Sequence, residues 1–184
     1  MVLEAAREAH DALFVRSPNS AADARQWMVL HTRSRQEKAV ALHLAAHGVA
    51  HFLPLRKQTI VWRGRRLKSL VPLFPGYVFL LGEREDAFSA IETKRVCQIL
   101  EVADQRRLEH ELAQIAAAME AGAGLESHPR LAIGQRCRIA RGPFMGIEGV
   151  VISNQRMTRL VLQVDMLGQG ASLEVEPACI ELLN

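Results

Sequence analysis

Three histidines have the spacing that most resembles a metal site. His43, His47 and His51 follow one another at intervals of four residues, and two histidines four apart on a helix share a face that can hold Zn²⁺. No cysteine or carboxylate lies among them, and Gly48 is expected to end the helix before His51. A polar helix face therefore explains these histidines better than a metal site does. We expect no bound metal and no cofactor.

The residue types needed for catalysis do not form a set. Cys97, Cys137 and Cys179 are widely spaced and odd in number, and no CxxC pair occurs. Reduced, packed thiols are therefore expected in place of disulfides or a zinc site. Cys97 and Cys137 have no obvious activating neighbour, and neither a nucleophile–base–acid set nor a phosphate-binding glycine loop is present. We predict no catalytic residues; turnover of a small substrate would contradict this.

Positive charge is concentrated in one part of a nearly balanced chain. The formal net charge is only +3, yet no acidic residue occurs from Lys38 to Gly82, and Arg33 and Arg35 lie just before this stretch. A segment of one sign predicts local contact with a polyanion, although a solvated basic face is an alternative that charge alone does not exclude. The cations of the stretch are Lys38, Arg56, Lys57, Arg63, Arg65, Arg66 and Lys68.

The elements that must position these residues alternate between strands and helices up to about residue 121. Ser34 is a candidate cap for a helix that Gly48 ends, and Arg63 and Gly64 lie in the turn of an expected hairpin. The pattern predicts an antiparallel sheet with helices, an α+β sandwich. Strands are expected at 27–31, 49–55, 59–62, 67–71, 77–81 and 96–102, and helices at 35–47, 86–94 and 104–122.

The remainder of the chain has a different pattern. Residues 1–25 are expected to be a poorly ordered extension or a short helix, and residues 122–130 are rich in glycine, serine and proline and predict a flexible linker. From residue 131 onward short strands replace helical periodicity, which predicts a small all-β barrel. Its strands are expected at 136–140, 149–152, 160–164, 173–175 and 180–182.

Three strings, in order, resemble the NusG/RfaH family. Trp27–Thr32 reads WMVLHT, Leu73–Phe79 reads LFPGYVF, and Gly142–Val151 reads GPFMGIEGVV, which is similar to the centre of a KOW motif. The resemblance covers residues 26–184. It implies an NGN domain at 26–121, a flexible linker at 122–130 and a KOW domain at 131–184.

The resemblance also implies a function. Such a protein is a cytoplasmic, monomeric transcription elongation factor that binds the clamp helices of RNA polymerase, suppresses pausing and modulates termination or antitermination. The compact segment between Leu55 and Pro72, with one basic hairpin, is similar to the operon-specific RfaH-like paralogs. The absence of an apolar run long enough for a membrane span, and of a secretory signal, agrees with that location. The alternative is a KOW-type RNA-binding module that acts on structured RNA such as rRNA.

The site residues are assigned from the resemblance. The polymerase-binding residues are His31, Tyr77 and Phe79, provided that these rings lie on an uncovered sheet face; the alternative is that they are core, as Phe74 is expected to be. Nontemplate DNA is the expected partner of the basic residues, and Lys94 and Arg95 are also candidates for the polymerase lobe opposite the clamp. The nucleic-acid-binding set is Arg33, Arg35, Lys38, Arg63, Arg65, Arg66, Lys68, Lys94 and Arg95.

Loop residues of the KOW domain are expected to bind a further partner. By resemblance that partner is a small-subunit ribosomal protein, and Leu167 stands where the family often has phenylalanine, which leaves binding of the termination helicase Rho open. The alternative is that Ile147 and Met166 simply fill the end of the barrel. The expected partner residues are Phe144, Ile147, Met166 and Leu167.

Overall fold

The computed structural model describes residues 25–63, 65–128, 134–153 and 158–183, which form two compact units. Of the described residues, the first unit holds those up to Pro54 and Phe74–Gln105, and the second holds those in Leu55–Leu73 and from Arg106 onward. In the described part of the chain, no helix is long and apolar enough to cross a membrane. The division does not test the domain limits expected from the sequence, which remain predictions.

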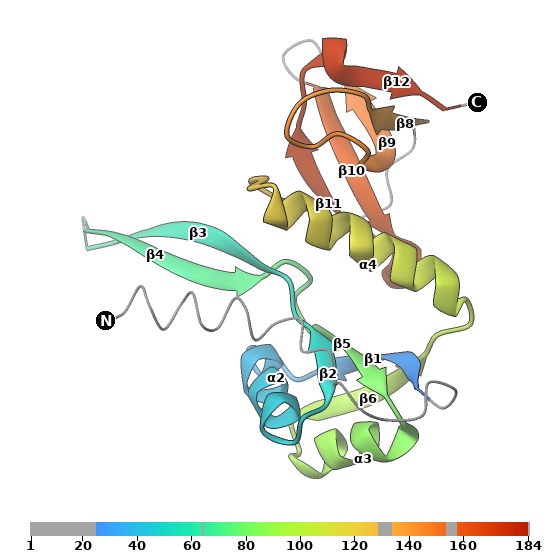
Figure 1. Cartoon of the computed structure of the whole chain (residues 1–184). Helices are drawn as coiled ribbons and strands as arrows, with labels where there is room; N and C mark the ends of the chain where they lie inside the picture. Colours follow the sequence, from blue (N-terminus) through green and yellow to red (C-terminus); the bar gives the residue numbers. More distant parts are fainter. Residues whose placement is uncertain (1–24, 64, 129–133, 154–157, 184) are drawn as a thin grey trace. The chain divides into compact units, whose positions relative to one another are not determined.

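The first unit is an antiparallel four-stranded sheet with two helices on one face (Figure 1). The strands lie in the order β2-β5-β1-β6. A carbon added at Gly82 would meet the Asp86 carboxylate of α3, so the face that carries Gly82, Leu80 and Val78 is the one that the helix covers. The elements are β1 (Gln26–Thr32), α2 (Glu37–Ala46), β2 (Ala50–Phe52), β5 (Tyr77–Gly82), α3 (Arg84–Glu92) and β6 (Val96–Glu101).

Helix α2 begins later than the sequence suggests. Gln36, not Ser34, is the N-cap, and it makes no side-chain cap hydrogen bond. The turn before it is closed by the Gln36 amide donating to the Arg33 carbonyl (3.1 Å) with Arg35 at φ 60°, so the helix cannot start at Ser34. The predicted end is confirmed, because Gly48 follows the cap at φ 68°.

Helix α3 buries a different face from the one that hydrophobicity favours. Phe88 is exposed, while Ala87 and Ala90 are fully buried. Small alanines let the helix lie close to the strands, where its Asp86 already contacts Gly82. A capping box between Glu83 and Asp86 sets the start of the helix.

The second unit contains a hairpin, a long helix and an all-β sheet, so the predicted α+β class is confirmed. The hairpin is a two-stranded sheet of its own, and the C-terminal sheet is antiparallel in the order β12-β8-β9-β10-β11-β7. The short 3₁₀ helices are η2 (Asp165–Leu167) and η3 (Pro177–Cys179). The other elements are β3 (Leu55–Trp62), β4 (Arg65–Pro72), α4 (Gln105–Glu120), β7 (Glu126–His128), β8 (Gln135–Ile139), β9 (Glu148–Ser153), β10 (Thr158–Val164), β11 (Gln169–Glu174) and β12 (Ile180–Leu182).

The C-terminal sheet contains the five expected strands and one more. Strand β7 lies inside the segment expected to be a linker and pairs with β11, with Ser127 opposite Ala171. Strands β9 and β10 approach closely at Gly149, where an added carbon would lie 2.6 Å from the Val161 carbonyl oxygen. Cys137 is buried in this sheet, and burial raises the pKa of its thiol, as expected for a packed and unreactive cysteine.

Candidate functional site

Two rings face each other at the end of the first sheet. His31, near the end of β1, is paired with Tyr77, the first residue of β5. Their ring centroids are 5.2 Å apart and the planes are inclined by 26°, which is a stacked arrangement. Both side chains are half-buried. The structure therefore brings together two of the three residues expected to bind polymerase and leaves part of each accessible.

The backbone beneath this pair is fixed by a buried carboxylate. Glu37, in the first turn of α2, is buried and accepts a hydrogen bond from the Gly76 amide (2.7 Å). The Gly76 carbonyl accepts one from the Thr32 amide (2.8 Å), which ties the start of β5 to the end of β1. Gly76 adopts φ 88°, in the left-handed region that favours glycine, and its missing side chain would lie 3.6 Å from the His31 ring. These bonds hold the ring pair in register.

Phe79 does not share the exposure expected of it. Its side chain is 0% exposed, so the expectation that it lies on an open face is corrected. Its ring lies edge-on to Phe74 at 6.0 Å and near Phe52 at 6.3 Å. It is paired with Val29 on one side and Phe52 on the other, so its whole row of the sheet is apolar. Phe79 is a core residue here, as Phe74 was expected to be.

Five cations of the predicted nucleic-acid set gather at the same end of the first unit. The turn after β1 and the segment before β6 are joined by the Arg33 amide, which donates to the Arg95 carbonyl (2.8 Å). The Arg95 guanidinium donates to the Gln36 amide oxygen (2.9 Å). A basic rim therefore borders the ring pair, formed by the exposed side chains of Arg33, Arg35, Lys38, Lys94 and Arg95.

Several of the basic residues occupy unusual backbone positions. Among the residues that the structure describes, those other than glycine with positive φ are Arg35 (60°), Lys94 (59°) and Arg63 (48°). All three belong to the predicted nucleic-acid set. The left-handed conformation is unfavourable for any residue with a side chain. Residues strained in this way cluster at active sites and ligand-binding sites. Their backbone geometry thus separates these cations from ordinary surface charge.

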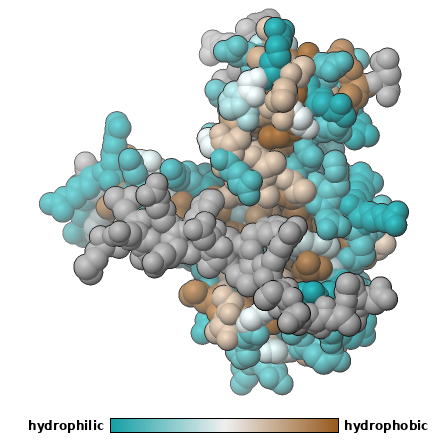
Figure 2. Space-filling view, viewed as in Figure 1, coloured by the Kyte–Doolittle hydropathy of each residue, from teal (hydrophilic) through white to brown (hydrophobic). Residues whose placement is uncertain are grey.

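The hairpin carries the remaining cations of the set. Arg63, Arg65, Arg66 and Lys68 are exposed at its end, where hydrophilic colour dominates the space-filling view (Figure 2). Strand pairing runs from Leu55 with Pro72 to Trp62 with Arg65, so the predicted hairpin is confirmed. Trp62, which is exposed beside the turn, is not among the predicted site residues. Its position in the sequence, between apolar residues and a basic turn, could have identified Trp62 as a candidate contact residue.

Only some of the loop residues of the C-terminal sheet that were expected to bind a partner are accessible. Ile147 is buried, so the expectation that it lies on an exposed loop tip is corrected in favour of the alternative, a residue that fills the sheet end. Its carbonyl accepts from the Ile139 amide (2.9 Å), which draws it inward. Phe144 and Leu167 are half-buried and Met166 is exposed. Met145, which was not predicted, is 70% exposed.

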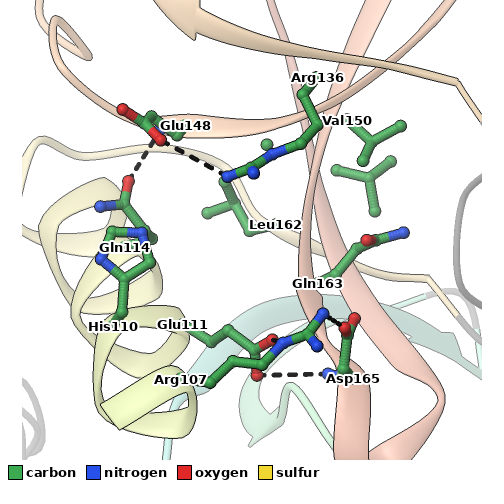
Figure 3. Close-up of a pocket in the computed structure, with 12 residues that line it drawn as sticks. Arg107, His110, Glu111, Gln114, Arg136, Glu148, Val150, Leu162, Gln163 and Asp165 are labelled. Atoms are coloured by element: carbon green, nitrogen blue, oxygen red, sulfur yellow. Dashed lines mark hydrogen bonds and ion pairs between the residues drawn. The ribbon is translucent and has the colours of Figure 1, made fainter. Parts of the chain in front are cut away.

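Within the second unit, α4 makes polar contacts with two of these loops (Figure 3). The Gln114 side-chain oxygen accepts from the Glu148 amide (2.8 Å), and the Glu111 carboxylate accepts from the Asp165 amide (3.2 Å). Arg107 also forms an ion pair with Asp165. The helix and the loops border a polar hollow that offers no group of three metal-ligating residues within the described residues.

The three histidines play separate structural roles. His43 lies 3.1 Å from the Ser89 hydroxyl on α3, and His47 lies 2.7 Å from the His43 carbonyl oxygen. His51 is buried in β2, where its Nδ1 donates to the Val49 carbonyl (2.9 Å), and burial lowers its pKa. Burial and the neighbouring His47 also lower the pKa of His43. The three rings are thus used in packing and hydrogen bonding.

Comparison with known proteins agrees with the fold. The family described as "Transcription termination factor nusG" matches residues 25–116, half of the 184-residue chain. A solved structure described as "Domain interaction in Thermotoga maritima NusG" has a TM-score of 0.50 and 20% identity, and the alignment covers 89% of this chain and 100% of that chain. Its likeness supports the fold alone. A comparison with curated proteins gives no match. The chain belongs to the NusG family of transcription factors, whose members interact with RNA polymerase.

Proposed function

We propose that this chain is a transcription elongation factor that docks on the clamp helices of the large RNA polymerase subunit through His31 and Tyr77. The stacked ring pair is the observation that carries the proposal. It is half-buried at a sheet end, whereas the next aromatic residue of the same strand, Phe79, is sealed in the core. Aromatic side chains that are rigid and partly accessible are typical anchors of protein interfaces.

The basic rim extends the proposal to nucleic acid. Arg33, Arg35, Lys38, Lys94 and Arg95 border the ring pair, so a protein docked there would hold these cations near the nontemplate strand or the polymerase lobe opposite the clamp. Contacts of this kind with phosphates contribute affinity and salt dependence, and they carry no sequence readout. The cations at the end of the hairpin are proposed to add to the same electrostatic attraction.

The effect on transcription follows from differential affinity. A factor that binds the closed, elongating state of polymerase more tightly than the paused state shifts the equilibrium by that difference. A tenfold preference corresponds to about 1.4 kcal/mol, enough to shorten pauses. The exposed Met166 and the half-buried Phe144 and Leu167 are proposed to bind a small-subunit ribosomal protein at the raised local concentration that tethering gives. An operon-specific role, as in RfaH-like paralogs, is the finer form of this proposal.

The docking proposal is tested with single substitutions of the ring pair. Tyr77→Ala and His31→Ala are each expected to weaken binding to purified core polymerase by about 30-fold or more, because anchors of this type contribute roughly 2 kcal/mol or more. Leu42→Ala, an exposed apolar residue on α2, is the matched control and should bind as the unmodified chain does.

Polymerase without the clamp helices identifies the partner surface. It is expected to lose affinity for the unmodified chain, and the two ring substitutions should then have no additional effect. Equal binding of Tyr77→Ala, His31→Ala and Leu42→Ala to intact polymerase would remove the docking assignment. Tight binding of the unmodified chain to structured RNA, with no binding to polymerase, would favour the alternative of an RNA-binding module.

A further inference from the structure

We propose that Trp62, together with Ile60 and Leu67, forms a stacking platform for an unpaired base of single-stranded nucleic acid. The inference deepens the proposed function, because it rests on the hairpin's contact with nucleic acid and names the kind of ligand that the hairpin takes. Trp62 has no role in the docking surface of the first unit.

The pairing register gives the hairpin two different faces. Paired residues lie on the same face of a two-stranded sheet, and residues two apart on one strand do so as well. Trp62 pairs with Arg65 and Ile60 with Leu67, so the tryptophan and two aliphatic side chains are neighbours on one face. The opposite face carries Val61 paired with Arg66 and Thr59 paired with Lys68. Near the turn, one face therefore carries three apolar side chains beside a single cation, and the other carries two cations beside one apolar side chain and a threonine.

The apolar face is open to solvent. Trp62 is 58% exposed, and Ile60 and Leu67 are about half exposed. The other tryptophan of the chain, Trp27, is only 7% exposed and packs in the first unit. The hairpin makes no backbone pairing with the other described strands. Contiguous exposed apolar side chains of this size indicate a contact surface.

The charge of the hairpin indicates which class of ligand it binds. The hairpin from Leu55 to Pro72 contains six cations and no acidic residue, which favours an anionic ligand over a neutral or basic surface. The Arg63 guanidinium lies 4.6 Å from the centre of the Trp62 ring, so a positive charge is held against the aromatic surface. In single-stranded nucleic acid, base faces are available for stacking and phosphates lie nearby, whereas a duplex hides the base faces. The combination of exposed indole and cations fits the single strand.

The test measures binding of the full chain to a twelve-nucleotide oligothymidylate and to a duplex of the same length. The oligothymidylate is expected to quench the emission of the exposed Trp62 and leave that of Trp27 unchanged. Trp62→Leu should weaken binding to the single strand by about 5- to 100-fold, the range measured for one base stacked on an aromatic side chain. Trp62→Phe should retain most of the affinity, and Val61→Ala, on the opposite face, should bind as the unmodified chain does.

Salt dependence separates stacking from the charge contribution. Trp62→Leu should leave the slope of affinity against salt concentration unchanged, while Arg66→Gln should reduce that slope by about one without removing the quenching. An unchanged salt slope in Arg66→Gln alone would count against the hairpin's phosphate contacts. Unchanged binding of Tyr77→Ala to polymerase would count against docking. The stacking proposal is overturned by equal binding of Trp62→Leu and the unmodified chain, by equal preference for duplex, or by a Trp62→Leu defect confined to polymerase.

Discussion

Substitution of Phe79 gives the sharpest test of how the first sheet divides core from contact surface. Phe79 and Tyr77 lie on the same face of β5, two residues apart, so periodicity alone assigns them the same environment. The structure assigns them different ones, with Phe79 fully buried and Tyr77 half-buried. Phe79→Ala should therefore affect folding, and Tyr77→Ala should mainly affect binding.

The expected magnitudes follow from burial and ring contacts. Phe79 is 0% exposed and contacts Phe74 and Phe52, so its truncation leaves a cavity that the sheet cannot close. A phenylalanine-to-alanine change in such a core lowers the free energy of unfolding by about 3–5 kcal/mol. Tyr77 loses only partial burial and one stacked pair with His31, which is roughly 1 kcal/mol.

Urea denaturation followed by circular dichroism measures both changes, and a pull-down of core polymerase measures binding. Phe79→Leu, which fills much of the same volume, is the matched control and should recover a large part of the lost stability. At a concentration of urea where Phe79→Ala remains folded, its affinity for polymerase should be close to that of the unmodified chain. Tyr77→Ala should show the reverse pattern, with small loss of stability and large loss of affinity.

The core assignment is refuted if Phe79→Ala loses less than about 1 kcal/mol, the usual upper range for substitutions of exposed residues. A strong binding defect in a fully stable Phe79→Ala protein would return Phe79 to the docking surface. In that case the row formed by Phe79 and Val29 would be accessible to the partner, and the stacked ring pair would not be the boundary of the contact surface.

Two further predictions concern strained and buried groups. Lys94→Gly should raise the free energy of unfolding by about 0.5–1 kcal/mol, because glycine relieves the positive φ of that position, while nucleic-acid affinity falls; a loss of stability in thermal melts would contradict this. The pKa of His51 is lowered by burial, so the neutral form is favoured in the folded state and the associated stability is present above the ordinary value of 6.5. That stability should be lost as the pH falls below 6.5 and through the lowered pKa of the folded state in denaturation experiments, and His51→Gln should reduce this dependence; identical pH profiles for the two proteins would refute it.

The strands and the turn signals were predictable because they depend on local pattern. A continuous apolar run predicted β5, and short runs separated by glycine predicted the C-terminal strands. The glycine turn within Arg63–Arg66 predicted the hairpin. The end of α2 at Gly48 was correctly predicted. The short strand β7 was missed, because three polar residues beside glycines and a proline carry no periodic signal, and its pairing with β11 is a long-range contact.

The division of roles along β5 could not be predicted, because it depends on register. Strand β2 pairs with β5 only as far as Phe52 opposite Phe79, so Phe79 has neighbours on both sides. Tyr77 lies beyond the end of that pairing and has only His31 beside it on β1. Periodicity identifies a face but does not say how far the neighbouring strands extend over it.

Backbone strain gives an independent argument for the basic residues. In the described part of the chain, the side-chain-bearing residues with left-handed φ are Arg35, Arg63 and Lys94, at three separate turns. The left-handed conformation costs a residue with a side chain roughly 1–2 kcal/mol, of which the greater entropy that glycine loses on folding would offset about half in a glycine variant. Lys94 takes the place after α3 where glycine commonly ends a helix, and its amide donates to the Ile91 carbonyl (2.8 Å) as a helix-ending bond. Strained backbone positions of this kind cluster at active sites and binding sites. The three positions therefore support a binding role on grounds that neither net charge nor family resemblance supplies.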